Sequence, residues 1–270
     1  MVHVRGLEVL KSAILVAMAE EPPFDQIYAE AYPELIKLYE NYGFQTFFVS
    51  GRPQTKYGRR LRRSLEEIRW SKFHIFLRIY DLFVLAHYKF LRPQLKTQGH
   101  TLRVNVPEDL RHLSIKILSS VSYLEEQGFN TIVRTTISSI LNPKLLRLVA
   151  RISNNSDEIF YGGRRIDQAD GFSFVSGSFT VWNSKAVRML KENRSSLDFS
   201  LIDDVCFGRL FRKKEVKIQD FPSVNLSSLS EISTVNNLSE IVHFRCRTGT
   251  RDRNDLEVMN SLLNSLKKVM

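Results

Sequence analysis

The stretch from Pro107 to Asn142 constrains the fold more than any other part of the chain, because a helical pattern there runs directly into a strand pattern. Apolar residues recur at three- and four-residue steps from Leu110 to Leu124, and Gly128 follows where a helix is expected to end. A β-branched run, Thr131–Val133, comes next. Alternation of helices and buried strands is typical of open α/β sheets. We therefore expect an α/β fold with a mostly parallel central sheet flanked by helices.

A cluster of small polar side chains and one base follows this predicted strand. Its members are Arg134, Thr135, Thr136, Ser138 and Ser139. Open α/β sheets bind ligands outside the carboxyl ends of their strands. The first hypothesis for a binding site is therefore placed here.

The first fifty residues predict one βαβ unit. A strand over 13–19 is followed by a helix from Phe24 to about Tyr42, and Gly43 ends that helix before a strand at Phe44–Ser50. In the second half we expect strand, tight turn and strand over Phe172–Trp182, and an irregular loop over 223–239. Other expected elements are strands at 101–106 and 216–221, a strand or turn at 160–162, and helices at 143–151, 184–192 and 256–268. Another helix is expected to carry Phe207, Leu210 and Phe211.

Residues 56–98 interrupt this alternation. Basic residues between Arg59 and Arg69 precede an aromatic segment of helical period, Trp70–Leu91. We interpret the chain as a single domain over 1–270 with a basic and aromatic helical insertion at about 56–98. The pattern favours a core or homodimer-interface helix at 70–91, and contact with a membrane surface is the alternative.

The net charge favours an anionic partner. The 270 residues carry a formal charge of +10, which suits nucleic acid, an anionic membrane surface or a phosphorylated small ligand. Cys206 and Cys246 lack metal-ligand spacing, so we expect reduced thiols. With no signal peptide visible, we expect a cytoplasmic protein, or one peripheral on a membrane. Phosphate-binding P-loop, dinucleotide-binding and zinc-protease motifs do not occur in the sequence.

Two charged features could carry chemistry. Asp203-Asp204 opens a predicted helix between apolar residues, so one carboxylate could be a general base, or the pair could be a helix cap with a solvated neighbour. A basic run near the C-terminus could bind a diphosphate through bidentate contacts, or it could be a solvated loop. Its members are His243, Arg245, Arg247, Arg251 and Arg253.

Four segments resemble, in order, the motifs of the β-1,3-galactosyltransferase and fringe-like glycosyltransferases. EDLRHLSIK at 108–116 is similar to that family's D-x-Y-x-N-L-T-x-K, and RTTISSILN at 134–142 takes the place of Lys-Thr-Asp-Asp-Asp-Val-Phe-Val-Asn. FVSGSFTVWN at 174–183 resembles Tyr-Cys-Ser-Gly-Gly-Gly-Tyr-Val-Leu-Ser. DDVCFG at 203–208 resembles Glu-Asp-Val-Tyr-Val-Gly. The four segments cover roughly Pro107 to Phe221, with the first βαβ unit also in agreement.

This resemblance implies a GT-A fold, in which a Rossmann-like sheet binds a nucleotide sugar. It implies an inverting transfer from a donor, expected to be a UDP-sugar, to a hydroxyl of a glycan or glycoconjugate acceptor. Asp203 or Asp204 would be the catalytic base. Donor and diphosphate contacts are expected from Arg134, Thr135, Thr136, Ser138, Ser176, Gly177, Ser178, His243, Arg245, Arg251 and Arg253.

The sequence departs from the family at the metal-binding turn. Thr136, Ile137 and Ser138 replace the Asp-x-Asp that holds a divalent cation, so dependence on Mn²⁺ or Mg²⁺ stays open and basic side chains are candidates to replace the metal. Two other classes also stay open. One is a non-catalytic relative that binds a nucleotide sugar or glycan. The other is a nucleic-acid-binding protein that uses Arg59–Arg69, although no base-reading motif supports it and no nucleic acid is expected.

Overall fold

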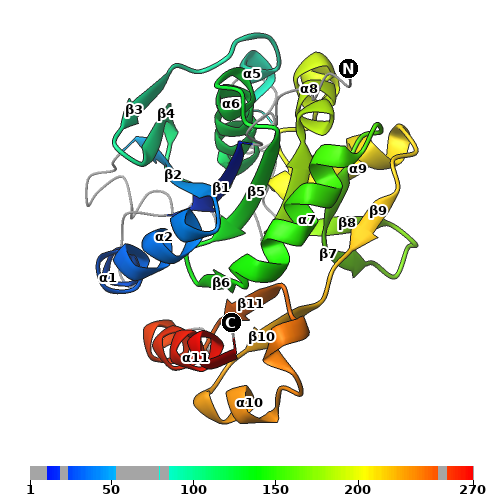
Figure 1. Ribbon diagram of the computed structural model, residues 1–270. Helices are drawn as coiled ribbons and strands as arrows, with labels where there is room; N and C mark the ends of the chain where they lie inside the picture. Colours follow the sequence, from blue (N-terminus) through cyan, green and yellow to red (C-terminus); the bar gives the residue numbers. More distant parts are fainter. Residues whose placement is uncertain (1–10, 19–23, 53–78, 80–84, 249–253, 270) are drawn as a thin grey trace, which may run out of the picture.

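An eight-stranded, mostly parallel sheet forms the centre of the computed structural model, which describes residues 11–18, 24–52, 79, 85–248 and 254–269 (Figure 1). The strand order is β3-β4-β2-β1-β5-β8-β7-β9. Only β3 and β8 run against the other six strands. The bounds are β1 Ser12–Ala17, β2 Phe44–Arg52, β3 Leu95–Gln98, β4 Thr101–Pro107, β5 Thr131–Thr136, β7 Tyr161–Asp167, β8 Ser173–Asn183 and β9 Ile218–Asp220. The predicted fold class is confirmed.

Helices cover both faces of this sheet, and each face has its own hydrophobic core. Helices α1, α2 and α7 pack on the face that carries Ile14 and Val133, whereas α6, α8 and α9 pack on the face that carries Leu15 and Ile132. Neighbouring residues of β1 and β5 thus enter opposite cores, as strand geometry requires. The bounds are α1 Phe24–Glu30, α2 Tyr32–Asn41, α5 Ala86–Phe90, α6 Leu113–Glu126, α7 Pro143–Asn155, α8 Ser184–Glu192 and α9 Asp203–Lys213.

A second, three-stranded sheet lies beside the main one. Its order is β10-β11-β6, formed by Ser223–Leu226, His243–Cys246 and Ser139–Leu141. Helices α10 (Leu229–Thr234) and α11 (Asp255–Val269) lie with it at the bottom of Figure 1. Short 3₁₀ helices occupy Arg194–Ser196 and Leu238–Glu240.

The predicted βαβ unit is confirmed, with one correction inside its helix. The single helix expected from Phe24 to Tyr42 is two helices that meet at Ala31. Pro33 lies at the start of α2 and has no backbone N–H to donate to the preceding turn. Gly43 follows with a φ of 88° and ends α2 as expected.

The expectation of strand, turn and strand over Phe172–Trp182 is wrong, because β8 is one continuous strand. The Ser176-Gly177-Ser178 sequence that suggested a turn lies in a bulge instead. Between the pairs Arg165↔Val175 and Gly163↔Thr180, β7 contributes one residue and β8 contributes residues 176–179.

Two further expectations near the C-terminus are corrected. The segment 223–239 is not an irregular loop, since it contains β10 and α10. The basic run that starts at His243 does not begin as a solvated loop either, because His243–Cys246 is strand β11 and hydrogen-bonds between β10 and β6. Arg251 and Arg253 lie outside the described residues.

Most of the proposed insertion, including the larger part of the helix expected at 70–91, lies outside the described residues. Of this region the structure describes Ile79 and everything from Leu85 onward. Its final residues form α5 and then β3, which pairs antiparallel with β4 as an edge strand of the main sheet. Within the described part of the chain, no helix has the length and apolar character needed to cross a membrane.

Gly163 allows β7 to pass the bulge of β8, so its replacement should destabilise the fold. Its φ is 141°, and an added Cβ would lie 2.1 Å from the backbone oxygen of Phe179. We expect Gly163→Ala to lower the free energy of unfolding by about 2 to 5 kcal/mol, through backbone strain and overpacking together. Urea denaturation would measure this loss.

The matched control is Gly171→Ala. Gly171 also has a positive φ, of 75°, but an added Cβ there meets nothing within 4 Å. It should therefore cost about 1 to 2 kcal/mol from the backbone conformation alone. Equal losses for the two variants would contradict the close packing of β7 against β8.

Candidate active site

The polar cluster predicted beyond β5 begins inside that strand. The sequence placed Arg134 and Thr135 after the strand's end, but β5 continues to Thr136 because both residues keep pairing with β8. Arg134 points to the face covered by α9, where it meets Asp203. The carboxyl end of β5, the bulge of β8 and the first turn of α9 therefore meet at one place.

A buried ion pair connects β5 to α9. Arg134 Nη2 lies 3.1 Å from Asp203 Oδ2, and both side chains are only 4% exposed. Burial raises the pKa of Asp203 to about 6, despite the opposing effect of the Arg134 guanidinium and with a smaller contribution from Asp204. Asp203 is thus enclosed and paired, which is the arrangement of a structural carboxylate.

Gly177 in the β8 bulge gives Arg134 the space that it occupies. A Cβ on Gly177 would lie 2.4 Å from Arg134 Nη1, so no other residue fits there without moving the guanidinium. The same glycine donates its backbone N–H to Asp204 Oδ2 at 3.1 Å. One residue therefore contacts both the ion pair and the second aspartate.

Asp204 differs from its neighbour in exposure and in partners. It is half-buried, whereas Asp203 is buried. Its Oδ1 accepts the backbone N–H of Val205 at 2.8 Å, and its Oδ2 accepts that of Gly177. Both residues lie in the first turn of α9, where the helix dipole favours negative charge. Asp204 is therefore an oriented carboxylate that solvent or a ligand can reach.

The serines of the bulge bond mainly to one another and to the backbone. Ser176 Oγ and Ser178 Oγ are 2.9 Å apart. Thr135 Oγ1 donates to the Ser178 carbonyl at 2.9 Å, and Thr180 Oγ1 donates to the Ser176 carbonyl at 2.9 Å. These buried hydroxyls hold the shape of the bulge, and with it the position of Gly177.

A chain of hydrogen bonds joins the turn after β5 to the small sheet. Thr136 Oγ1 lies 2.8 Å from Ser139 Oγ, which lies 3.2 Å from His243 Nε2. His243 is fully buried and stacks on Phe179 with ring centroids 5.1 Å apart. Burial lowers its pKa to about 3, with Arg164 and Arg245 acting in the same direction, so the ring is neutral.

The second ring nitrogen of His243 indicates which groups donate in these hydrogen bonds. His243 Nδ1 has no hydrogen-bond partner in the described structure. A buried N–H without a partner is rarer in proteins than an unpaired acceptor, which favours the tautomer with hydrogen on Nε2. Nε2–H then donates to Ser139, and Ser139 donates to Thr136. The half-buried Thr136 hydroxyl is left free to donate outward, as an anionic ligand requires.

The positive charge near these hydrogen bonds comes partly from Arg164, a residue that the sequence analysis did not single out. Arg164 lies half-buried in β7, and its Nη1 donates to Asn225 Oδ1 at 2.5 Å. Together with the half-buried Arg245 of β11 it acts electrostatically on His243. No sequence motif marks Arg164, because its contact is with Asn225 of β10, far away in the sequence, and β10 pairs with β11. Arg247 is exposed.

The residues in the position of the metal-binding turn do not fit a divalent cation. Thr136 and Ser138 offer neutral hydroxyls, and Ile137 is buried in the hydrophobic core. Mg²⁺ and related cations in nucleotide sites are usually held by carboxylates. Across the described parts of the chain, no three His, Cys, Asp or Glu side chains are grouped so that they could hold a metal.

The segment 108–116 connects β4 to α6 and contacts elements on both sides. Ser114 Oγ donates to the carbonyl of Leu201, just before α9. Glu108 accepts the backbone N–H of Gly51 and pairs with the buried Lys116. Asp109 Oδ1 lies 2.7 Å from His112 Nδ1. None of these contacts reaches Asp203 or Asp204. The structure thus brings together three of the four segments that resemble the glycosyltransferase motifs, at 134–136, 176–178 and 203–204.

Comparison with solved structures gives weak similarity over most of the chain. A glycosyltransferase involved in the glycosylation of the major capsid of PBCV-1 shares 11% identity at a TM-score of 0.46, covering 94% of this chain and 99% of the other. Mouse xyloside xylosyltransferase 1 shares 10% identity at a TM-score of 0.43, covering 87% and 96%. The inositol-1-phosphate CTP transferase of T. maritima shares 14% at 0.38, covering 94% and 96%. We base no inference on similarities of this size. Neither a protein-family model nor a curated protein matches the sequence.

The two neighbouring aspartates should differ strongly in their effect on stability. Asp203→Asn leaves the buried Arg134 without its charge partner, and we expect a loss of about 3 to 5 kcal/mol in unfolding free energy. Asp204→Asn keeps one acceptor oxygen, and it loses one of two backbone hydrogen bonds and a charge near a helix terminus, so about 1 to 2 kcal/mol is expected. Urea denaturation of both variants measures the difference.

A double variant controls for the origin of the Asp203 effect. Arg134→Met combined with Asp203→Leu removes both charges from the buried site, and its stability should exceed that of Asp203→Asn. If the double variant is the less stable of the two, the loss does not come from an unpaired charge.

Proposed function

We propose that this protein is an inverting glycosyltransferase that moves a sugar from a nucleotide-sugar donor, a UDP-sugar in the first instance, to a hydroxyl of a glycan or glycoconjugate. One observation carries the proposal. Three segments that resemble the motifs of one glycosyltransferase family lie far apart in the sequence and yet contact one another through Arg134–Asp203 and Gly177–Asp204.

Asp204 is the proposed catalytic base. Its carboxylate is oriented by two backbone N–H groups and is half-buried, so an acceptor hydroxyl can approach it. Asp203 is enclosed and neutralised by Arg134, and it serves instead to hold the start of α9 against β5. The difference in exposure between the two acids supports the choice of Asp204 over Asp203.

The proposed reaction is a single displacement at the anomeric carbon. Asp204 takes the proton of the acceptor hydroxyl as the acceptor oxygen forms its bond to the anomeric carbon. The bond from that carbon to the diphosphate oxygen breaks, and its electron pair leaves with the nucleoside diphosphate. Attack from the side opposite the leaving group inverts the configuration. A positioned base contributes about 10²- to 10⁴-fold to such a step.

The leaving diphosphate is proposed to lie against the turn after β5. With hydrogen on His243 Nε2 the Thr136 hydroxyl is free to donate there. Burial lowers the pKa of His243, and the positive charges of Arg164 and Arg245 act in the same direction. Fixed donors and positive charge stabilise the negative charge that develops as the bond breaks. Arg134 is committed to Asp203, so we assign it a positioning role.

The proposed transfer does not require a metal cation. Hydroxyls and arginines bind phosphate without a bridging metal, and the Thr136–Ser138 turn offers no carboxylate that would hold one. Charge stabilisation would then rest on protein groups alone.

Replacing Asp204 should abolish transfer while sparing donor binding. For Asp204→Asn we expect turnover with UDP-sugars to fall by about 10²- to 10⁴-fold, with UDP raising the thermal midpoint as in the wild type. Release of UDP measures turnover. Asp157→Asn is the matched control, because Asp157 is exposed and lies just past the far end of α7.

The outcomes separate the two open functions. If Asp204→Asn turns over like the wild type, Asp204 is not the base. If the wild type binds UDP but transfers no sugar to any acceptor and does not hydrolyse the donor, the protein is the non-catalytic relative and the proposed activity is wrong.

Chelation should leave nucleotide binding unchanged. We expect the rise in thermal midpoint on adding UDP to be equal with and without EDTA, because the proposed contacts are hydroxyls and guanidinium groups. Readdition of Mn²⁺ to the chelated sample is the control. A rise that disappears with EDTA and returns with Mn²⁺ would show that a cation is required.

A further inference from the structure

Helix α7 presents an unusual outer face. Its buried side packs into the hydrophobic core through residues including Leu146 and Val149. Its outward residues follow a regular helical stripe in which cations line one edge and aliphatic side chains the other. They are Lys144, Arg147 and Arg151 on one edge and Leu148 and Ile152 on the other.

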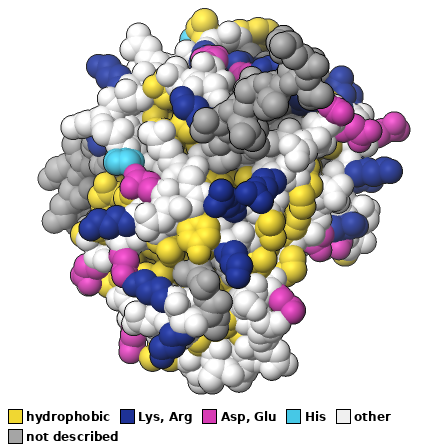
Figure 2. Space-filling model, in the orientation of Figure 1, with side chains coloured by type: hydrophobic (Ala, Val, Ile, Leu, Met, Phe, Trp, Pro, Cys, Tyr) yellow, Lys and Arg dark blue, Asp and Glu magenta, His cyan; other side chains and the backbone are white. Residues whose placement is uncertain are grey.

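The aliphatic residues are exposed to an extent that calls for an explanation. Leu148 is 50% exposed and Ile152 is 56% exposed. They lie one helical turn apart and so form a continuous edge. Figure 2 shows Lys and Arg side chains beside a stripe of hydrophobic ones over α7, which faces the viewer.

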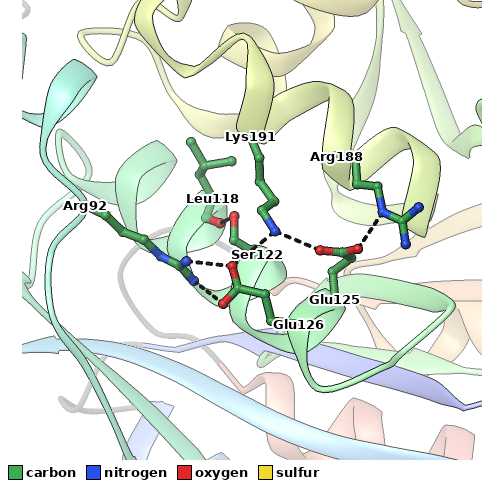
Figure 3. Close-up of polar contacts among 7 residues, drawn as sticks. All are labelled: Arg92, Leu118, Ser122, Glu125, Glu126, Arg188 and Lys191. Carbon is green, nitrogen blue, oxygen red and sulfur yellow. Dashed lines mark hydrogen bonds and ion pairs between the residues drawn. The ribbon is translucent and has the colours of Figure 1, made fainter.

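The cations of α7 have no ionic partners among the described residues. The helix contains no acidic residue, and in the part of the chain that the structure describes none of its three cations makes an ion pair or a side-chain hydrogen bond. On α8, by contrast, Arg188 and Lys191 pair with Glu125 and Glu126 of α6 (Figure 3).

This combination fits one class of partner. Two copies of the face would bring like charges together, which disfavours self-association. Nucleic acid would meet the cations but leave Leu148 and Ile152 in water. An anionic bilayer satisfies both edges, since lipid phosphates attract the cations and the acyl boundary accepts the aliphatic side chains.

We propose that the outer face of α7 docks this protein onto anionic membrane surfaces. The helix lies along the bilayer plane, with Leu148 and Ile152 inserted and Lys144, Arg147 and Arg151 among the headgroups. The attachment is peripheral and reversible, because only one short helix face takes part. It is independent of the proposed transferase activity.

Co-sedimentation with vesicles tests the proposal. The full chain should sediment with vesicles of phosphatidylcholine containing phosphatidylglycerol and stay in solution with phosphatidylcholine alone. We expect Arg147→Gln/Arg151→Gln to lower the partition coefficient about tenfold or more. Leu148→Ser/Ile152→Ser should lower it by a similar factor, about tenfold, through lost insertion.

The control must separate this face from the general positive charge of the chain. Lys213→Gln/Lys214→Gln removes the same charge from exposed positions at the end of α9 and should change the partition coefficient by less than about twofold. All six side chains are exposed, so the thermal midpoints should stay close to that of the wild type.

Three results would overturn the proposal. The first is a wild type that does not sediment with the anionic vesicles. The second is a control pair that weakens binding as much as the arginine pair does, which would indicate diffuse charge alone. The third is an aliphatic pair that binds like the wild type, which would mean that no side chain of α7 inserts.

Discussion

The buried pair of Arg134 and Asp203 is the contact on which the rest of the site depends. Two charges that are almost fully enclosed are stable only when each neutralises the other. The pair therefore fixes the start of α9 against β5, and it sets the place where Asp204 emerges. Gly177 completes the arrangement, because the guanidinium occupies the space of its missing side chain and its N–H orients Asp204.

The local patterns of the chain predict its framework well. Gly43 and Gly128 mark helix ends and have positive φ, and the apolar periods locate β1, β2, β4, β5, α6 and α8 within a few residues. Each of these elements is defined by burial of one face or both, which is a property that alternation in sequence records directly. The fold class followed from these elements alone.

The errors occur where tertiary contacts override a local pattern. Ser-Gly-Ser is typical of a turn, yet β8 continues through it because Gly177 is required by Arg134 and not by the backbone. His243 opens a run of cations that favours solvent, yet it is buried in β11 because the small sheet places it against Phe179. Arg164 carries no signal of its own, and the fold brings it near His243 through its contact with β10, which pairs with β11. The sequence likewise could not predict which of the adjacent residues Asp203 and Asp204 is buried and which is half-exposed.

The site has a negatively charged side at Asp204 and a positively charged side near His243 and Thr136. On one side Asp204 offers an accessible carboxylate beside a neutralised neighbour. On the other side the neutral His243 is hydrogen-bonded to Ser139, and Ser139 is hydrogen-bonded to Thr136. The positive charges of Arg164 and Arg245 lie nearby. The proposed proton acceptor is thus held at the start of α9, and the proposed anion-binding region lies at the end of β5 and on the small sheet. Since His243 stays neutral far below physiological pH, the direction of its hydrogen bonds does not depend on protonation. The fold itself, through burial of one aspartate and one histidine, leaves Asp204 as the accessible carboxylate and keeps the histidine neutral.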